Sequence, residues 1–178
     1  MAITTASVVV VAGVEQGILL AMALSLLRIV QHSYHPHTGV MVKNEDGSWK
    51  LTPVTPGAVT KPGLVMYRFG ATLFYANASR FAAEVNCLVG PGPSPVRWLI
   101  VDAEAITALD FSAARVVREL QQDLKDCGVE LGFVRMAWDL KADFDRHHLT
   151  EVIDPSRMFD HLHNVLAAFE KLQATTSS

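Results

Sequence analysis

Residues 97–114 read RWLIVDAEAITALDFSAA, and this stretch decides the fold class of the chain. Residues 98–101 form an uninterrupted apolar run, which is typical of a strand covered on both faces. Asp110 then precedes a segment whose apolar residues, including Val117, Leu120 and Leu124, recur at helical spacing. A buried strand followed by an amphipathic helix is the repeating unit of an α/β fold, with Leu120 facing the sheet.

Further strands and helices alternate on both sides of this unit. We expect further strands at 64–69, 131–136 and 151–153, one edge strand within 49–54, and a short extended piece at 72–75. We expect helices that begin after Asn77 and after Asp110 as N-caps, and two more at 139–148 and 158–172. The alternation predicts a mostly parallel sheet of four or five strands with four helices.

An apolar run of membrane length precedes this part of the chain. Residues 6–30 read ASVVVVAGVEQGILLAMALSLLRIV, and about 20 apolar residues suffice to cross the hydrocarbon core of a bilayer. The first residues contain no Lys or Arg, and no clear small-x-small cleavage site follows, which argues against a secretory signal. Arg28 and Lys43 both follow the apolar run, so the positive-inside rule places the next domain in the cytoplasm.

One face of this predicted helix is built from small residues. Gly13, Gly17, Ala21 and Ser25 recur every four positions, where the backbones of neighbouring helices can approach closely. Glu15 lies near the middle of the run, at a depth where an acidic side chain costs about 2.5–3.5 kcal/mol. We therefore favour a helix that packs against other membrane helices or a second copy of itself. The alternative is an ordinary single anchor.

Composition sets limits on the function. With 178 residues, the chain is divided into a membrane-type helix (1–31), a connector with a short edge strand (32–63), an α/β domain (64–174) and a disordered tail (175–178). The net charge of −3 gives no indication of a nucleic-acid surface, and we expect no nucleic-acid partner. Two distant cysteines, Cys87 and Cys127, fit free thiols in a reducing cytoplasm.

The candidate site residues lie next to the quoted stretch. Asp110, Phe111 and Ser112 open a helix whose N–H groups favour an anion, and the simpler interpretation is that Asp110 only caps that helix. Asp102 ends the central strand, and we expect it to be a water-exposed strand end rather than a ligand group. Seven histidines have no metal-ligand spacing, no nucleophile–base pair can be named, and no Gly-rich phosphate loop is present. We expect no metal, no cofactor and no enzymatic activity.

Four stretches together resemble a known family. They are GVEQGILLAMALSLLRIVQHSYHPHTGV (13–40), MYRFGATLFYANASRF (66–81), residues 97–114, and GVELGFVRMAWDLKADFDRHHL (128–149). The first resembles the end of the last membrane helix of SulP-family anion transporters, and the others resemble their C-terminal STAS domain. The resemblance implies a cytoplasmic STAS domain that regulates or assembles a transporter at the inner (plasma) membrane.

The resemblance also implies what this chain lacks. The substrate site of SulP transporters lies among earlier membrane helices, so we expect a fragment without the transport core. In stand-alone STAS antagonists an Asp-Ser pair carries a phosphorylated serine, whereas Phe111 follows Asp110 here and Ser112 is one place further along. The alternative function is a membrane-tethered signalling regulator that binds a kinase-type cytoplasmic partner, and the missing hydroxyl argues against it.

Overall fold

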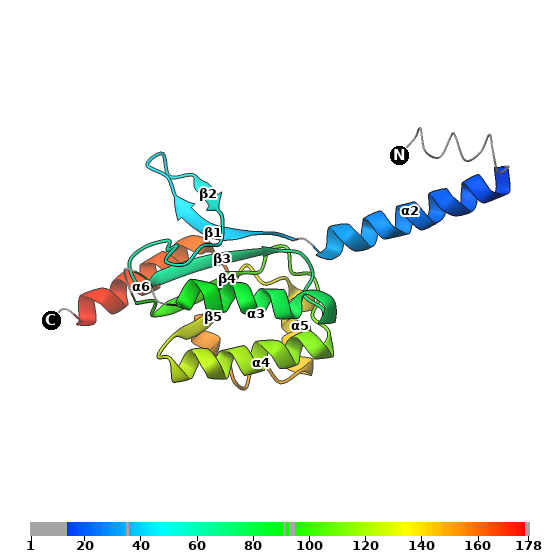
Figure 1. Ribbon diagram of the computed structural model, residues 1–178. Coiled ribbons are helices and arrows are strands. Elements are labelled where there is room, and N and C mark those ends of the chain that lie inside the picture. The colour runs from blue at the N-terminus through cyan, green and yellow to red at the C-terminus, as the bar shows by residue number, and fades with distance from the viewer. Residues whose placement is uncertain (1–13, 35, 91, 93–94, 177–178) are drawn as a thin grey trace. The chain divides into compact units, whose positions relative to one another are not determined.

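The computed structural model describes residues 14–34, 36–90, 92 and 95–176. The chain divides into two compact units, Met1–Pro36 and His37–Ser178, and each is described by itself. In the first unit the described residues form one helix, α2 (Val14–Tyr34) (Figure 1). Its exposed large apolar side chains are Ile18, Leu19, Met22, Leu26 and Leu27.

The predicted membrane segment falls only partly within the described residues. Among these, no helix combines the length and the apolar character needed to cross a membrane. The apolar run starts at Ala6, and residues 6–13 lie outside the described part of the chain.

The second unit is built on a six-stranded sheet. Its strands are β1 (His37–Lys43), β2 (Trp49–Thr52), β3 (Leu64–Gly70), β4 (Trp98–Asp102), β5 (Glu130–Val134) and β6 (Met158–Phe159), in the spatial order β2-β1-β3-β4-β5-β6. The strands β3 to β6 are parallel, whereas β1 is antiparallel to both of its neighbours. All five residues of β4 are buried, which confirms the strand predicted from the apolar run.

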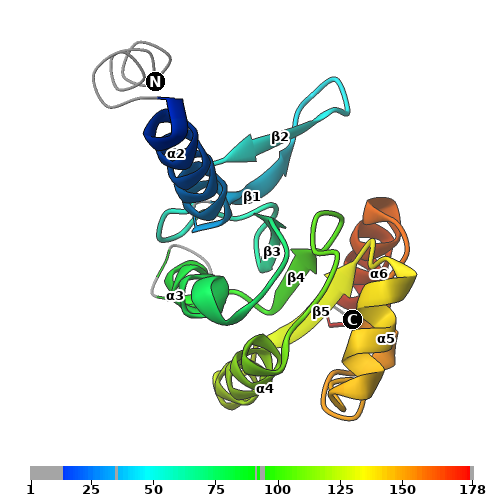
Figure 2. The same cartoon turned by 90° about the vertical axis from the view of Figure 1, so that its right-hand side faces the viewer.

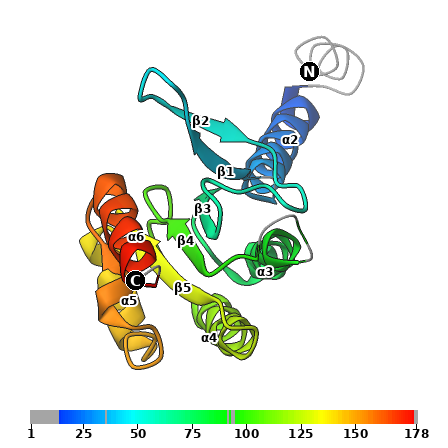
Figure 3. The same ribbon diagram turned by 90° about the vertical axis from the view of Figure 1, so that its left-hand side faces the viewer.

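Helices cover both faces of this sheet. The helices α3 (Tyr75–Val89) and α4 (Phe111–Asp126) lie on one face, and α6 (Leu162–Thr176) lies on the other (Figures 2 and 3). Between β5 and β6 the chain forms α5 (Trp138–Arg146) and a 3₁₀ turn, η1 (Pro155–Arg157). This arrangement confirms the predicted α/β class, with six strands in place of the four or five expected.

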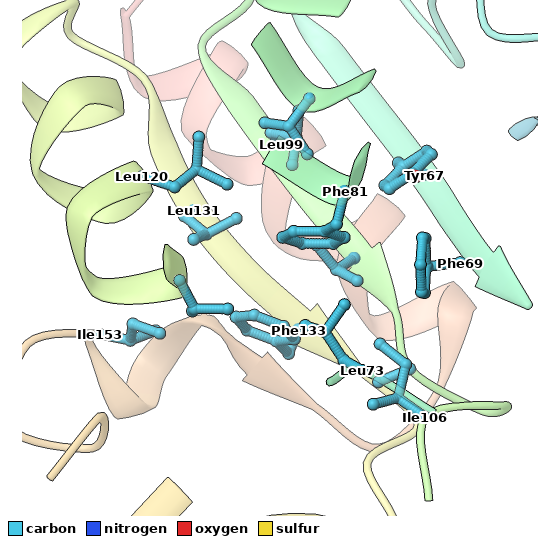
Figure 4. Packing of buried hydrophobic residues seen from close by; sticks show 14 of the residues in the cluster. Tyr67, Phe69, Leu73, Phe81, Leu99, Ile106, Leu120, Leu131, Phe133 and Ile153 are labelled. Carbon is cyan, nitrogen blue, oxygen red and sulfur yellow. The ribbon is translucent and has the colours of Figure 1, made fainter. Parts of the chain in front are cut away.

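The larger core lies between the sheet and α3 and α4. It is rich in aromatic rings, among which Phe81 stands edge-on to Phe69 at a centroid distance of 5.5 Å and lies 5.9 Å from Tyr67 (Figure 4). Leu120 of α4 packs in the same cluster with 2% of its surface exposed, so its predicted orientation toward the sheet is confirmed.

Truncating Leu120 tests this packing directly. We expect Leu120→Ala to lower the free energy of unfolding by about 2–5 kcal/mol, because the change leaves a cavity beside β5 that the neighbours fill only in part. Denaturant titration measures this loss in the free energy of unfolding, provided that the slope against denaturant concentration is unchanged. Replacement of exposed Gln122 by alanine is the control on the same helix, and an equal effect of the two substitutions would contradict the predicted packing.

Several local predictions need correction. Helix α3 begins at Tyr75, so Asn77 is not its N-cap: the side chain of Asn77 instead accepts the Phe74 N–H (2.9 Å) and donates to the Thr72 carbonyl (2.9 Å) from inside the first turn. The short extended piece expected at 72–75 is cut short by α3, which begins at Tyr75, and it contains a single bridge from Leu73 to Leu109. Residues 151–153 are turns, and the edge strand is β6, whose residues were assigned to the last helix.

The buried hydroxyl of Tyr67 makes stability depend on alkaline pH. Burial, and secondly the 2.7 Å hydrogen bond that Tyr67 donates to Glu84, raise the pKa of Tyr67 far above its usual value. The folded state therefore keeps this proton above pH 10, where the unfolded chain releases it, and stability falls as pH rises. We expect the folding equilibrium constant to lose up to about tenfold per pH unit above pH 10, and Tyr67→Phe to remove that contribution. If the free energy of unfolding fell with the same slope above pH 10 in the unchanged protein and in Tyr67→Phe, this prediction would be contradicted.

Candidate functional site at the carboxyl edge of the sheet

The turn before α4 is held by its own aspartate. Asp110 is the N-cap of α4 and accepts the Ala113 N–H through one carboxylate oxygen (2.7 Å), as its predicted capping role requires. Its other oxygen accepts the Tyr75 N–H (2.9 Å), a contact that sequence analysis did not anticipate. Since both oxygens are engaged, Asp110 joins the start of α3 to the start of α4.

A buried aspartate of α5 fixes the same turn from the other side. The carboxylate of Asp143 accepts the Leu109 N–H (2.9 Å) and pairs with Arg146 (2.6 Å), and Asp143 is only 8% exposed. The backbone bridge between Leu73 and Leu109 adds a further link. The loops that follow β3 and β4 and the helix that follows β5 are therefore tied into one rigid edge.

The two residues after Asp110 are both exposed. Phe111, the first residue of α4, is 74% exposed, and its ring stands 6.2 Å from the imidazole of His147. Ser112, the second residue of α4, is also exposed. The position directly after the cap thus presents an aromatic ring rather than a hydroxyl.

The expectation that Asp102 is exposed to water is wrong. Its side chain is fully buried, not a water-exposed strand end. Arg68 donates to it from the end of β3 (2.6 Å), and Arg135 donates through two nitrogens from the end of β5 (3.0 and 2.6 Å). Both arginines also pair with Glu104. The burial could not be read from the sequence because neither arginine is near Asp102 in the chain.

A second feature that sequence analysis missed is a small basic pocket beside Phe111. It has a volume of about 320 Å³ and lies between the first two turns of α4 and the end of α5. Its lining includes three arginines, Arg115, Arg118 and Arg146, and two histidines, His147 and His148. Arg118 donates to the His147 carbonyl, which holds the two walls together.

The remaining predicted positions are distributed over both units. Gly17 is buried and Ala21 and Ser25 are exposed along α2, while Gly13 lies outside the described residues. Within the described ranges no group of three or more metal-ligating side chains occurs. His161 lies directly before α6, and its ring stacks on that of His163 at a centroid distance of 5.3 Å.

Comparison with known proteins identifies the family. Residues 55–165 match the STAS domain family, so the chain belongs to it. A "Probable sulfate transporter" of Mycobacterium tuberculosis is 30% identical over 96% of this chain and 31% of its own length. The chain thus spans about a third of that relative. The "Probable sulfate transporter 4.2" of Arabidopsis thaliana is 23% identical over 86% of this chain and 24% of its own length.

Solved structures share the fold. The anion transporter Slc26a9 of mouse superposes with a TM-score of 0.74 at 16% identity, over 88% of this chain and 26% of that one. The STAS domain of a SulP transporter from Vibrio cholerae gives a TM-score of 0.51 at 14% identity, over 73% of this chain and 92% of that one. The predicted resemblance to the STAS part of SulP transporters is therefore confirmed.

Proposed function

We propose that the chain forms the STAS part of a SulP-type inorganic anion transporter, where it acts as a non-catalytic regulatory and assembly module. One observation carries the proposal. The alignment with the mycobacterial relative covers 96% of this chain, so it includes both α2 and the domain that follows, in the same order. That relative is named for sulfate, which makes an inorganic oxyanion the first substrate class to test.

The chemistry of the carboxyl edge supports a module of this kind. The buried charged groups at this edge form internal bonds: the carboxylate of Asp143 accepts the Leu109 N–H and pairs with Arg146, and Asp102 is held by two arginines. Charge-assisted hydrogen bonds of this kind are strong, and they fix the surface that carries them. An edge of this design presents shape and charge to a partner.

Membrane attachment is the second part of the proposal. We place residues 1–31 in the inner membrane, packed against other transporter helices or a second copy, and the domain in the cytoplasm. The exposed apolar side chains of α2 support this, because they need an apolar environment or a partner helix. The basic residues Arg28 and Lys43 follow the apolar run, as the positive-inside rule requires of a cytoplasmic domain.

A chimera tests the proposed function. The third of the mycobacterial relative that aligns with this chain is replaced by this chain, and uptake of labelled sulfate is compared with the intact relative and with a version lacking that third. We expect the chimera to recover uptake to within about tenfold of the relative. A chimera that reaches the membrane in normal amounts, yet transports no more than the truncated version, would overturn the proposal.

The small-residue face of α2 yields a separate prediction. Gly17→Ile should reduce crosslinking of the chain to its membrane partners, because a branched side chain prevents the close approach of two helix backbones. We expect a loss of about tenfold, which corresponds to about 1.4 kcal/mol in association free energy. Met22→Ile changes an exposed residue off that face and serves as the control. Equal crosslinking of the two variants would remove the packing argument.

A further inference from the structure

Three aromatic side chains project from the carboxyl edge of the sheet. Tyr75, Phe111 and Trp138 are 68, 74 and 77% exposed, which makes them the most exposed large hydrophobic residues among those described. Each is the first residue of a helix, namely α3, α4 and α5. By contrast, the rings of Tyr67 and Phe81 in the core are fully buried. Exposure of aromatic rings is therefore concentrated at this one edge, and exposed apolar clusters mark interaction surfaces.

These rings are held on a rigid support. The backbone N–H of Tyr75 donates to Asp110, the residue directly before Phe111. One carboxylate therefore fixes the first turns of both helices that carry these two rings. Trp138 opens the helix whose Asp143 accepts the Leu109 N–H. A surface fixed in this way loses little conformational freedom when it binds.

Basic side chains accompany the rings. Arg115, Arg118 and Arg146 line the pocket beside Phe111. Arg115 pairs with Glu119 at 3.6 Å and Arg146 with Asp143 at 2.6 Å, yet their side chains stay 68 and 69% exposed. Because a guanidinium carries five N–H donors, each arginine keeps donors for a phosphate while it holds its carboxylate.

The chain enters the domain at this same edge. His37, the first residue of β1, pairs with Gly70, the last residue of β3, and α2 ends only three residues earlier at Tyr34. If the segment before β1 lies in the bilayer, as the proposed function holds, the aromatic edge is tethered beside the membrane surface. Tryptophan and tyrosine together with arginine are the side chains that favour the headgroup region.

We propose that the carboxyl edge, with Tyr75, Phe111 and Trp138 as anchors, docks on the headgroup layer of acidic phospholipids. The rings enter the interface and the three arginines bind lipid phosphates. This inference rests on the proposed function only for the membrane segment that tethers the domain. Lipid binding by the edge itself does not require a transporter. Docking would hold the STAS domain in one orientation beneath the transporter.

Tryptophan fluorescence of the full chain tests the proposal. The chain is reconstituted with vesicles of phosphatidylcholine and phosphatidylglycerol that contain brominated lipid, a contact quencher. Trp98 is 2% exposed and Trp49 is half-buried, so the signal of Trp138 is obtained by subtracting the spectrum of Trp138→Phe. We expect brominated lipid to quench that signal at least about twofold, and the quenching to weaken at high salt because the phosphate contacts are screened.

A double variant supplies the matched comparison. Tyr75→Ser with Phe111→Ser removes two anchors from exposed positions, and we expect the fraction of docked Trp138 to fall about tenfold. Val152→Ser removes an exposed apolar side chain near the end of α4 and should leave the quenching unchanged. Thermal melts of all variants establish that the domain stays folded.

The outcomes separate this proposal from the proposed function. If the chain inserts and the chimera transports sulfate while brominated lipid leaves Trp138 unquenched, lipid docking is wrong and the transporter role stands. If Trp138 becomes protected only when the transporter membrane part is present, without quenching by lipid, the occupant is protein and the proposal is overturned. Quenching of Trp138 together with an inactive chimera would support lipid docking and contradict the transporter role.

Discussion

Replacing Asp102 with alanine is expected to lower the free energy of unfolding by about 3–5 kcal/mol. The carboxylate is completely buried, and the two arginines that donate to it are 31 and 24% exposed. Its removal leaves two partly buried guanidinium groups facing each other, with only the exposed carboxylate of Glu104 to share. Breaking a buried ion pair from one side is costly because the remaining charge has lost its solvation and its partner.

Glu104→Ala is the matched control for this prediction. Glu104 contacts the same two arginines but is 55% exposed, so its loss should cost less than about 1 kcal/mol. Urea titrations measure the free energy of unfolding of the two variants, provided that the slope against urea concentration is unchanged. The difference between them compares the loss of a buried carboxylate with the loss of an exposed one. A loss below about 1 kcal/mol for Asp102→Ala would show that Asp102 is accessible to water, as the sequence alone had suggested.

The central unit of the fold could be predicted because its signals are local. Trp98 to Val101 are consecutive apolar residues and Asp110 is a favourable cap. Gly128, which follows the C-cap Cys127 of α4, has the left-handed φ of 74° that glycine favours at this position. The strand β1 could not be found in this way. Its residues, HTGVMVK, contain neither a long apolar run nor clear alternation, and their strand structure depends on pairing with β3 and β2.

The candidate site was predictable only in part, for the same reason. The capping role of Asp110 depends on residues within three positions of it, and it was predicted correctly. The contacts of Asp110 with Tyr75 and of Asp102 with Arg68 and Arg135 join residues more than 30 positions apart. Spacing in the sequence carries no signal for such contacts.

The second large effect is expected at the centre of the aromatic core. Phe81→Ala should lower the free energy of unfolding by about 3–5 kcal/mol, because it removes a fully buried ring that contacts Tyr67 and Phe69 and opens a cavity under α3. Phe81→Leu keeps most of the volume and should cost clearly less. A similar loss in the two variants would mean that ring contacts, not cavity volume, dominate at this position.

The same substitution tests whether the two units are independent. Phe81 belongs to the His37–Ser178 unit, whereas the small-residue face belongs to α2 in the other unit. If the membrane segment associates through its own helix face, Phe81→Ala should unfold the domain at lower denaturant and leave crosslinking through α2 unchanged. In the double variant with Gly17→Ile, crosslinking through α2 should fall as far as it does in Gly17→Ile alone. Loss of crosslinking in Phe81→Ala alone would instead assign the association to the STAS domain.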